Sequence, residues 1–255
     1  MSAEIFYTTT QGNDGLWQWS FLDPQDKPTK IPNTEGLGFY SIVQVKNELY
    51  LTTQGSNGIW KYRIGTGERP IQIPNTEGFG FYGLVHVDNY LYLTAQDTSG
   101  VWRYEIGSEE KPKQISRTNG LGFSQVIRLK DIMYFTTQGN DGIWQWSFLN
   151  PQDIPNKIPN TEGLGFTGMV IVKEKLYLTA HGNNGIWKYE IGTEKRPVQI
   201  PSTKGFGFNG LAKSSTCLYL LAQDTSGVWR YEIGSEEKPE QIKKTNGLGF
   251  LFGTF

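Results

Sequence analysis

The sequence predicts an all-β protein, a six-bladed β-propeller of four-stranded antiparallel blades, and three observations support this fold class. A repeat of about 42 residues fills the chain, each repeat holds four short β-type segments, and the two chain ends fall within one repeat. Periods of roughly 40–45 residues with four strands per unit are typical of propeller blades. We therefore expect residues 1–255 to form a single domain.

The repeat is most visible in six tryptophans, which are 42 or 43 residues apart. Each follows a tight turn and one aliphatic residue, as in GNDGLW and DTSGVW. A longer period of 127 residues contains three of these repeats: residue n resembles residue n+127 without a gap. For example, QGNDGLWQWS at 11–20 returns as QGNDGIWQWS at 138–147. The repeats therefore form two similar halves of three blades. The six residues are Trp17, Trp60, Trp102, Trp144, Trp187 and Trp229.

Within one unit the pattern predicts four strands, here named A to D from the propeller axis outward. Residues 81–87 are apolar and β-rich, residues 90–95 and 101–106 alternate, and a short segment near 112–115 completes the unit. Turns rich in Gly, Asn, Asp and Ser separate these segments, and no ten-residue window has a helical period.

The chain ends predict how the ring closes. The sequence starts in the second strand of a unit, at 5–10, and stops after the first strand of another, at 247–255. We expect one blade to take its innermost strand from the C-terminus and its outer three from the N-terminus, which removes exposed sheet edges.

Composition excludes several function classes. With 24 basic and 25 acidic residues the net charge is −1, which gives no basis for binding nucleic acid or an anionic membrane surface. One Cys and two His cannot supply a structural zinc site. Three GxGxxG segments, at 78–83, 163–168 and 205–210, begin β-type stretches and not helices. Together these observations lead us to expect no metal and no nucleotide cofactor.

No stretch suits membrane insertion or secretion, which predicts a soluble protein that is cytoplasmic or released without a conventional signal peptide.

The two faces of the predicted ring differ. On one face the D–A loops between blades and the B–C turns within blades are nearly constant, as in PNTEGLGF at 32–39 and 159–166, whereas the A–B turns of the other face vary. A structural interpretation is that Gly supplies positive φ, Asn and Asp brace turns, and each Trp packs between neighbouring blades.

The functional interpretation of the constant face is carbohydrate binding. Planar amide and carboxylate side chains can hydrogen-bond pairs of sugar hydroxyls, and an aromatic ring can hold the apolar face of a sugar. This predicts up to six similar sites, between or atop adjacent blades. The candidate residues of the B–C turns and strand C are Gln11, Asn13, Asp14, Trp17, Gln54, Asn57, Trp60, Gln96, Asp97, Trp102, Gln138, Asn140, Asp141, Trp144, His181, Asn183, Asn184, Trp187, Gln223, Asp224 and Trp229; those of the D–A loops are Asn33, Glu35, Asn75, Glu77, Asn119, Asn160, Glu162 and Asn246.

The segments GFGFYGLVHVDNYLYL and QGNDGIWQW resemble the blades of propeller lectins of the tachylectin-2 and tectonin kind. In those proteins a Gly-aromatic stretch opens the innermost strand and an Asn/Asp-rich turn precedes a Trp. The likeness occurs once per unit along the full chain. It implies the propeller fold, six-fold multivalency and glycan binding, and it implies no individual ligand contact.

Two other function classes remain open at this point. A protein-interaction scaffold is one, although varied loops would suit it better than repeated ones. A small-molecule enzyme that uses the propeller channel is the other. Repetition favours a lectin, an agglutinin without catalytic activity, because several weak sites on one rigid body gain avidity through effective concentration. The expected partners are neutral glycans.

Overall fold

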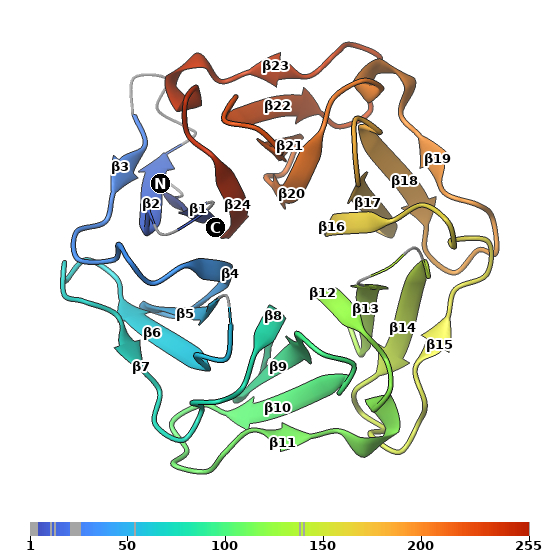
Figure 1. Cartoon of the computed structure of the whole chain (residues 1–255). Helices are drawn as coiled ribbons and strands as arrows, with labels where there is room; N and C mark the ends of the chain where they lie inside the picture. The colour runs from blue at the N-terminus through green and yellow to red at the C-terminus, as the bar shows by residue number, and fades with distance from the viewer. Residues whose placement is uncertain are drawn as a thin grey trace.

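A computed structural model shows six four-stranded antiparallel sheets arranged in a ring (Figure 1). The described residues are 5–10, 12, 14–20, 27–53, 55–137, 139 and 141–254. The predicted six-bladed β-propeller is therefore confirmed. We number the blades so that blade 1 holds both chain ends and blades 2 to 6 follow in chain order.

Each blade runs from its innermost strand A to its outermost strand D, and Figure 1 shows the A strands facing the centre of the ring. The A strands of blades 1 to 6 are β24 (Phe250–Thr254), β4 (Phe39–Val45), β8 (Phe81–Val87), β12 (Phe123–Leu129), β16 (Phe166–Val172) and β20 (Phe208–Lys213). The B strands are β1 (Ile5–Thr10), β5 (Glu48–Thr53), β9 (Tyr90–Ala95), β13 (Ile132–Thr137), β17 (Lys175–Ala180) and β21 (Cys217–Ala222).

The outer strands are shorter. The C strands, in the same order, are β2 (Leu16–Ser20), β6 (Ile59–Arg63), β10 (Val101–Glu105), β14 (Ile143–Ser147), β18 (Ile186–Glu190) and β22 (Val228–Glu232). The D strands are β3 (Thr29–Lys30), β7 (Ile71–Gln72), β11 (Lys113–Gln114), β15 (Asn156–Lys157), β19 (Val198–Gln199) and β23 (Glu240–Gln241). Three one-turn 3₁₀ helices, η1 (Ser116–Thr118), η2 (Pro201–Thr203) and η3 (Lys243–Thr245), follow the D strands of blades 3, 5 and 6.

The ring closes in blade 1 as the sequence predicts. Strand β24 pairs antiparallel with β1, with Tyr7 opposite Thr254 and Thr8 opposite Gly253. The hydroxyl of Thr8 also donates to the Phe252 carbonyl at 2.8 Å. Blade 1 is thus completed by strands from the two ends of the chain, and β1 gains a partner along its inner edge.

Six hydrophobic clusters make up the core, and each lies at the junction of two adjacent blades. At the junction of blades 2 and 3, Tyr50 and Ile59 of blade 2 pack with Phe81, Leu91 and Leu93 of blade 3. Because the flat face of every sheet packs against its neighbour, burial of apolar surface stabilises the ring as a whole and not each blade alone.

A buried threonine in each D–A loop locks the loop to strand C of the blade it is leaving. In blade 3 the Thr118 hydroxyl accepts from the Val101 backbone N–H at 2.7 Å and donates to the Ile115 carbonyl at 2.7 Å. The preceding Gly100 has a φ of 81°, and an added Cβ would overlap Thr118. The same Thr and Gly pair occurs in every blade: Thr34 with Gly15, Thr76 with Gly58, Thr118 with Gly100, Thr161 with Gly142, Thr203 with Gly185, and Thr245 with Gly227.

A second threonine joins adjacent blades near the axis. In blade 3 the Thr94 hydroxyl accepts from the Gly83 N–H at a β-bulge of strand A and donates to the Ser124 carbonyl of blade 4 at 2.7 Å. Thr9, Thr52 and Thr179 make the equivalent bond to the next blade. Blade 6 has Leu221 at this position, so its B strand has no hydroxyl to donate there.

We expect Thr118→Val to destabilise the fold by about 1–3 kcal/mol, because it leaves the Val101 N–H buried without a partner and removes one of the two hydrogen bonds to the Ile115 carbonyl. Chemical denaturation measures the change in the free energy of unfolding. Thr98→Val, at an exposed position of the B–C turn in the same blade, is the matched control and should change the free energy by less than about 0.5 kcal/mol. Equal effects of the two substitutions would contradict the proposed lock.

Candidate functional site

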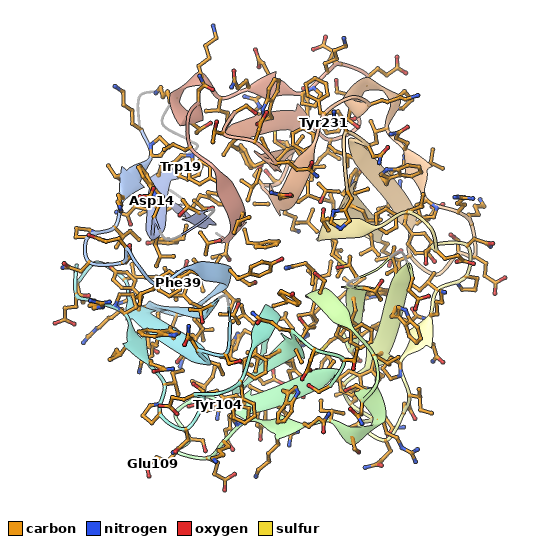
Figure 2. All side chains as sticks on the ribbon, in the orientation of Figure 1. Asp14, Trp19, Phe39, Tyr104, Glu109 and Tyr231 are labelled. Atoms are coloured by element: carbon orange, nitrogen blue, oxygen red, sulfur yellow. The ribbon has the colours of Figure 1, made fainter. Side chains whose placement is uncertain are left out.

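The D–A loops and B–C turns share one face of the ring, as the sequence predicts. In blade 2 the Gly58 N–H donates to the Phe79 carbonyl, and the Gly78 N–H donates to the Ser56 carbonyl, both at 2.9 Å. Figure 2 shows Asp14, a candidate residue from the B–C turn of blade 1, beside β2. The structure therefore brings the candidate B–C and D–A residues together on this face, which we call the rim.

On the rim, one side chain from each D strand forms a latch to the B–C turn of its own blade. Lys30 Nζ donates to Asp14 Oδ1 at 2.8 Å, and this bond raises the pKa of the Lys30 ammonium. The equivalent pair in blade 4 is Lys157 with Asp141 at 2.6 Å. In the other blades a Gln amide donates to a turn carbonyl: Gln72 to Asn57, Gln114 to Ser99, Gln199 to Asn184, and Gln241 to Ser226.

Each of the six tryptophans is half-buried and belongs to an inter-blade cluster. Five contact, edge-on, the Phe that opens strand A of the same blade, for example Trp60 against Phe39 with ring centroids 6.4 Å apart. Trp229 packs against Phe206 at 5.1 Å. Several indole N–H groups also bond to the turn three residues earlier, as Trp60 Nε1 does to the Asn57 carbonyl. The indoles thus serve packing between blades, as the structural interpretation proposed.

The two candidate glutamines that the structure describes at the start of B–C turns bond to backbone carbonyls, and one of them reaches the neighbouring blade. Gln96 Nε2 donates to the Thr53 carbonyl of blade 2 at 3.0 Å and to the Phe81 carbonyl of its own blade at 3.2 Å. Gln223 Nε2 donates to the Phe208 carbonyl at 3.4 Å. His181 takes this position in blade 5 and lies at the mouth of the central channel. Gln11, Asn13, Gln54, Gln138 and Asn140 lie outside the described residues.

The asparagines of the D–A loops hold the next blade. Asn33, Asn75 and Asn160 have φ near +60°, and each side-chain amide donates to a backbone carbonyl 34 residues later, of Gly67, Glu109 and Glu194. Blades 3, 5 and 6 lack an Asn at this point and form the 3₁₀ turns η1 to η3 instead. Asn119 and Asn246 each accept from a Gln of the preceding D strand. Glu35, Glu77 and Glu162 are exposed.

The remaining candidate residues of the B–C turns either bond within their own turn or are exposed. Asp97 and Asp224 brace their own turns by accepting from the backbone N–H groups of Ser99 and Ser226, both at 2.8 Å, and hydrogen bonds from these serines lower the pKa of both carboxyls. Asn184 donates to the His181 carbonyl at 2.6 Å, while Asn183 is exposed. Much of the predicted hydrogen-bonding capacity of the rim is therefore already used within the protein.

A hollow of about 470 Å³ lies between blades 2 and 3 on the outer side of the ring. Glu48 accepts from the Tyr50 hydroxyl at 2.8 Å, and Lys61 Nζ lies 3.4 Å from the same carboxylate. Blade 3 contributes Tyr104 and the segment 106–109, and Figure 2 shows Tyr104 and Glu109 toward the outer margin of that blade. The hollow thus has an apolar interior with a charged pair on its wall.

An equivalent, smaller hollow of about 170 Å³ lies between blades 3 and 4. It shares aromatic and basic positions with the first hollow, with Tyr92 for Tyr50, Arg103 for Lys61 and Trp146 for Tyr104, whereas Lys113 and Ser116 replace Ile71 and Pro74. The position of Glu48 is taken by Tyr90, so the second hollow lacks the carboxylate. Sequence reasoning missed these residues. A signal was present, because an aromatic residue occurs two positions after every repeat Trp, in the pattern Trp-x-Tyr or Trp-x-Trp.

The central channel opens on the rim into a cavity of about 280 Å³. Six side chains form a ring around it, each directly following the Phe that opens an A strand: Tyr40, Tyr82, Ser124, Thr167, Asn209 and Leu251. Below lies a second cavity of about 380 Å³, where His86, Gln125 and Arg128 line the wall beside aliphatic residues, and Phe252 borders both cavities. These ring residues were not among the sequence candidates, although their position changes in nearly every repeat while the Gly-Phe pair before it stays constant.

The described residues contain no group of three or more His, Cys, Asp or Glu side chains that could hold a metal ion. In the same part of the chain, no helix is long and apolar enough to cross a membrane.

Comparison with known proteins shows the fold. No protein-family model and no curated protein matches the chain at a significant level. Among solved structures, a chain of a nidogen/laminin complex has a TM-score of 0.72 at 13% identity and covers 98% of both chains. A catalytically inactive variant of virginiamycin B lyase from Staphylococcus aureus, crystallised with quinupristin, has a TM-score of 0.67 at 16% identity and covers 95% of this chain and 82% of the lyase chain.

The computationally designed Ika8 protein is also similar, with a TM-score of 0.56, 15% identity and coverage of 98% of this chain and 77% of the designed one. At these identities the likenesses support the six-bladed propeller fold and carry no function with them. The narrower resemblance to lectins of the tachylectin-2 and tectonin kind stays a prediction.

We expect Trp102→Phe to lower the free energy of unfolding by about 1–2 kcal/mol. The smaller ring makes less edge-on contact with Phe79 and Phe81, and the hydrogen bond to Ser99 Oγ is lost. Thermal denaturation monitored by circular dichroism measures the loss. Unchanged stability would show that the indole does not support the junction of blades 2 and 3.

The carboxyl of Asp97 should titrate below the ordinary aspartate range, because the Ser99 donors favour its charged form. With the folded-state pKa below the unfolded one, this turn contributes stability above the ordinary carboxyl pKa and loses it as pH falls through the lowered value. The amide shift of Ser99, followed by NMR from neutral to acid pH, reports the midpoint. Asp97→Asn should abolish this transition, and a midpoint at the ordinary aspartate value would contradict the assignment.

Proposed function

We propose that this protein is a multivalent carbohydrate-binding protein whose sites are hollows between adjacent blades. The observation that carries the proposal is the recurrence of a hollow at equivalent positions, each with a Tyr on strand B, a basic residue on strand C and an aromatic residue of the next blade, at the junctions of blades 2 and 3 and of blades 3 and 4. Concave sites with a largely apolar lining and a few polar groups are the usual form of small-ligand sites.

The hollow between blades 2 and 3 has the chemistry that a neutral sugar requires. The Glu48 carboxylate accepts one bond from Tyr50 and retains lone pairs for sugar hydroxyls, and Lys61 has donors beyond its contact with Glu48. The apolar face of a sugar ring could lie against Ile71 and Pro74, which line the same hollow. Donors, acceptors and an apolar face are thus within one site.

The location differs from the rim sites that the sequence favoured. On the rim, the planar side chains bond to neighbouring turns and the indoles pack between blades. A ligand there would have to break latches that stabilise the protein, whereas the hollows need no such rearrangement. Binding at an inter-blade hollow agrees with the placement that the lectin resemblance implies.

Repeated sugar sites raise the overall affinity of the protein for a multivalent glycan. A single shallow sugar site binds weakly, but copies held on one rigid ring raise the effective concentration of each further contact with a multivalent glycan. The proposal assigns binding, and no catalysis, to these hollows.

A glycan array followed by calorimetry with the best monosaccharide tests the proposal. We expect at least two sugars bound per chain. Lys61→Met should weaken the site between blades 2 and 3 at least about tenfold, as the loss of a charged hydrogen bond does, and Arg103→Met should do the same between blades 3 and 4.

Lys173→Met, on the exposed A–B turn of blade 5 away from both hollows, is the matched control and should leave sugar binding unchanged. Trp102→Phe, in protein that circular dichroism shows to be folded, separates the two locations: the number of sugars bound per chain stays the same if the sites are the hollows and falls by one if the sites are on the rim. An array with no bound glycan, or a stoichiometry of one, would argue against the lectin proposal.

A protein-interaction scaffold is the second candidate. Four large aliphatic side chains are more than half exposed, and Ile71 and Val198 occupy equivalent positions in the D strands of blades 2 and 5. The others, Leu149 and Ile154, lie in the C–D connection of blade 4. A blank glycan array, together with a protein partner lost on Ile71→Ser, would favour this class over the lectin.

A further inference from the structure

The channel mouth departs from the repetition that governs the rest of the molecule. Most residues of one half recur in the other half 127 positions later. At the mouth ring all three such pairs differ: Tyr40 with Thr167, Tyr82 with Asn209, and Ser124 with Leu251. The one place where the six A strands converge is therefore also a place where the two halves differ most in chemistry.

These differences divide the mouth into two sides. Blades 1, 2 and 3 supply an aromatic side, where the Tyr40 ring lies 5.0 Å from Phe252 and 5.1 Å from Tyr82, at tilts of 45° and 48°. Blades 4, 5 and 6 supply a polar side made of Ser124, Thr167 and Asn209, joined by Thr137 and His181 at the ends of two B strands. A flat apolar surface thus faces a set of hydrogen-bonding groups across one cavity.

The polar side retains capacity for a ligand. The backbone carbonyls of Ser124 and Asn209 already accept from Thr94 and Thr179 of the preceding blades. Within the described residues, the side chains of Ser124, Asn209 and His181 make no hydrogen bond to another group of the protein. The backbone carbonyls of Ser124 and Asn209 thus serve the contacts between blades, and the side chains of Ser124, Asn209 and His181 face the cavity.

Charge and size narrow the class of ligand. Among the described residues, no Lys, Arg, Asp or Glu lines the mouth, so no charged side chain of this part of the chain compensates a formal charge on a ligand there. Burial raises the pKa of the Tyr40 hydroxyl, which stays neutral and keeps the aromatic side uncharged. A cavity of about 280 Å³ lies at the small end of ligand sites. It suits a molecule of one or two rings.

We propose that the channel mouth is a single binding site for a small uncharged molecule that has a flat unsaturated ring and a hydrogen-bonding group at its edge. The ring packs against Tyr40, Tyr82 and Phe252, where offset or edge-on aromatic contacts are favourable. The edge group bonds to Asn209 and Ser124. This site is separate from the repeated hollows and is present once per chain.

Saturation-transfer NMR with benzamide as the probe tests this site in the full chain. We expect transfer to the benzamide ring protons at millimolar concentration. Cyclohexanecarboxamide, which keeps the amide without the flat ring, and benzoate, which keeps the ring and adds a charge, should both bind more weakly. Absence of transfer to benzamide would overturn the proposal.

Two variants locate the binding. Asn209→Ala should raise the benzamide dissociation constant about five- to tenfold through loss of a neutral hydrogen bond. Tyr82→Leu, which keeps an apolar side chain but removes the flat ring, should reduce ring-proton transfer. Asn89→Ala, on an exposed A–B turn, is the matched control. Circular dichroism melts confirm that the variants are folded. Benzamide binding that is equal in all variants would place the probe elsewhere and also overturn the proposal, whereas glycan binding at the hollows is expected to survive every substitution in this set.

Discussion

The propeller depends on one repeated constraint, the buried threonine that ties each D–A loop to strand C of the blade it leaves. The hydroxyl satisfies both a strand N–H and a loop carbonyl, and the Gly beside it allows the close approach because it carries no Cβ. Since the loop then enters the next blade, the lock also fixes where that blade begins. Six such locks, with the inter-blade clusters beneath them, set the angle at which neighbouring sheets meet.

Much of this architecture can be predicted from the sequence, because six copies of one pattern locate the strands more surely than any single segment does. The strand over Phe81–Val87 and the opening strand Ile5–Thr10 have the predicted bounds, and the closure of blade 1 follows from the phase of the repeat at the two ends. The third strand of that unit ends at Glu105, one residue short of the predicted segment, where the chain turns outward. Period and phase are global properties of the chain, so small errors in single elements do not disturb them.

The site could be predicted less well, for a physical reason. A sequence shows which hydrogen-bonding groups are available on a face but not which of them bond to one another. Asp14 looks like a ligand-binding carboxylate until Lys30, sixteen residues later, is found latched to it, and Asn75 looks like a free amide until it reaches Glu109 of the next blade. Conversely, Tyr82 and Asn209 belong to one cavity because the ring closes, which no local pattern reports. Repetition drew attention to the constant residues, yet the constant residues are mostly those that hold the blades together.

The hydroxyl bridges near the axis are not the same at every junction. Thr bridges from B strands tie blade 1 to 2, 2 to 3, 3 to 4 and 5 to 6, and at the junction of blades 6 and 1 Leu221 takes the bridging position. The same junction joins the last continuous blade to the one composed of both chain ends. Local opening concentrates where few hydrogen bonds cross a boundary. The chain itself crosses this junction from β23 to β24, and the ring is closed inside blade 1 by the pairing of β24 with β1. Opening of the ring therefore requires β24 to separate from β1, next to the junction where Leu221 replaces the bridging threonine.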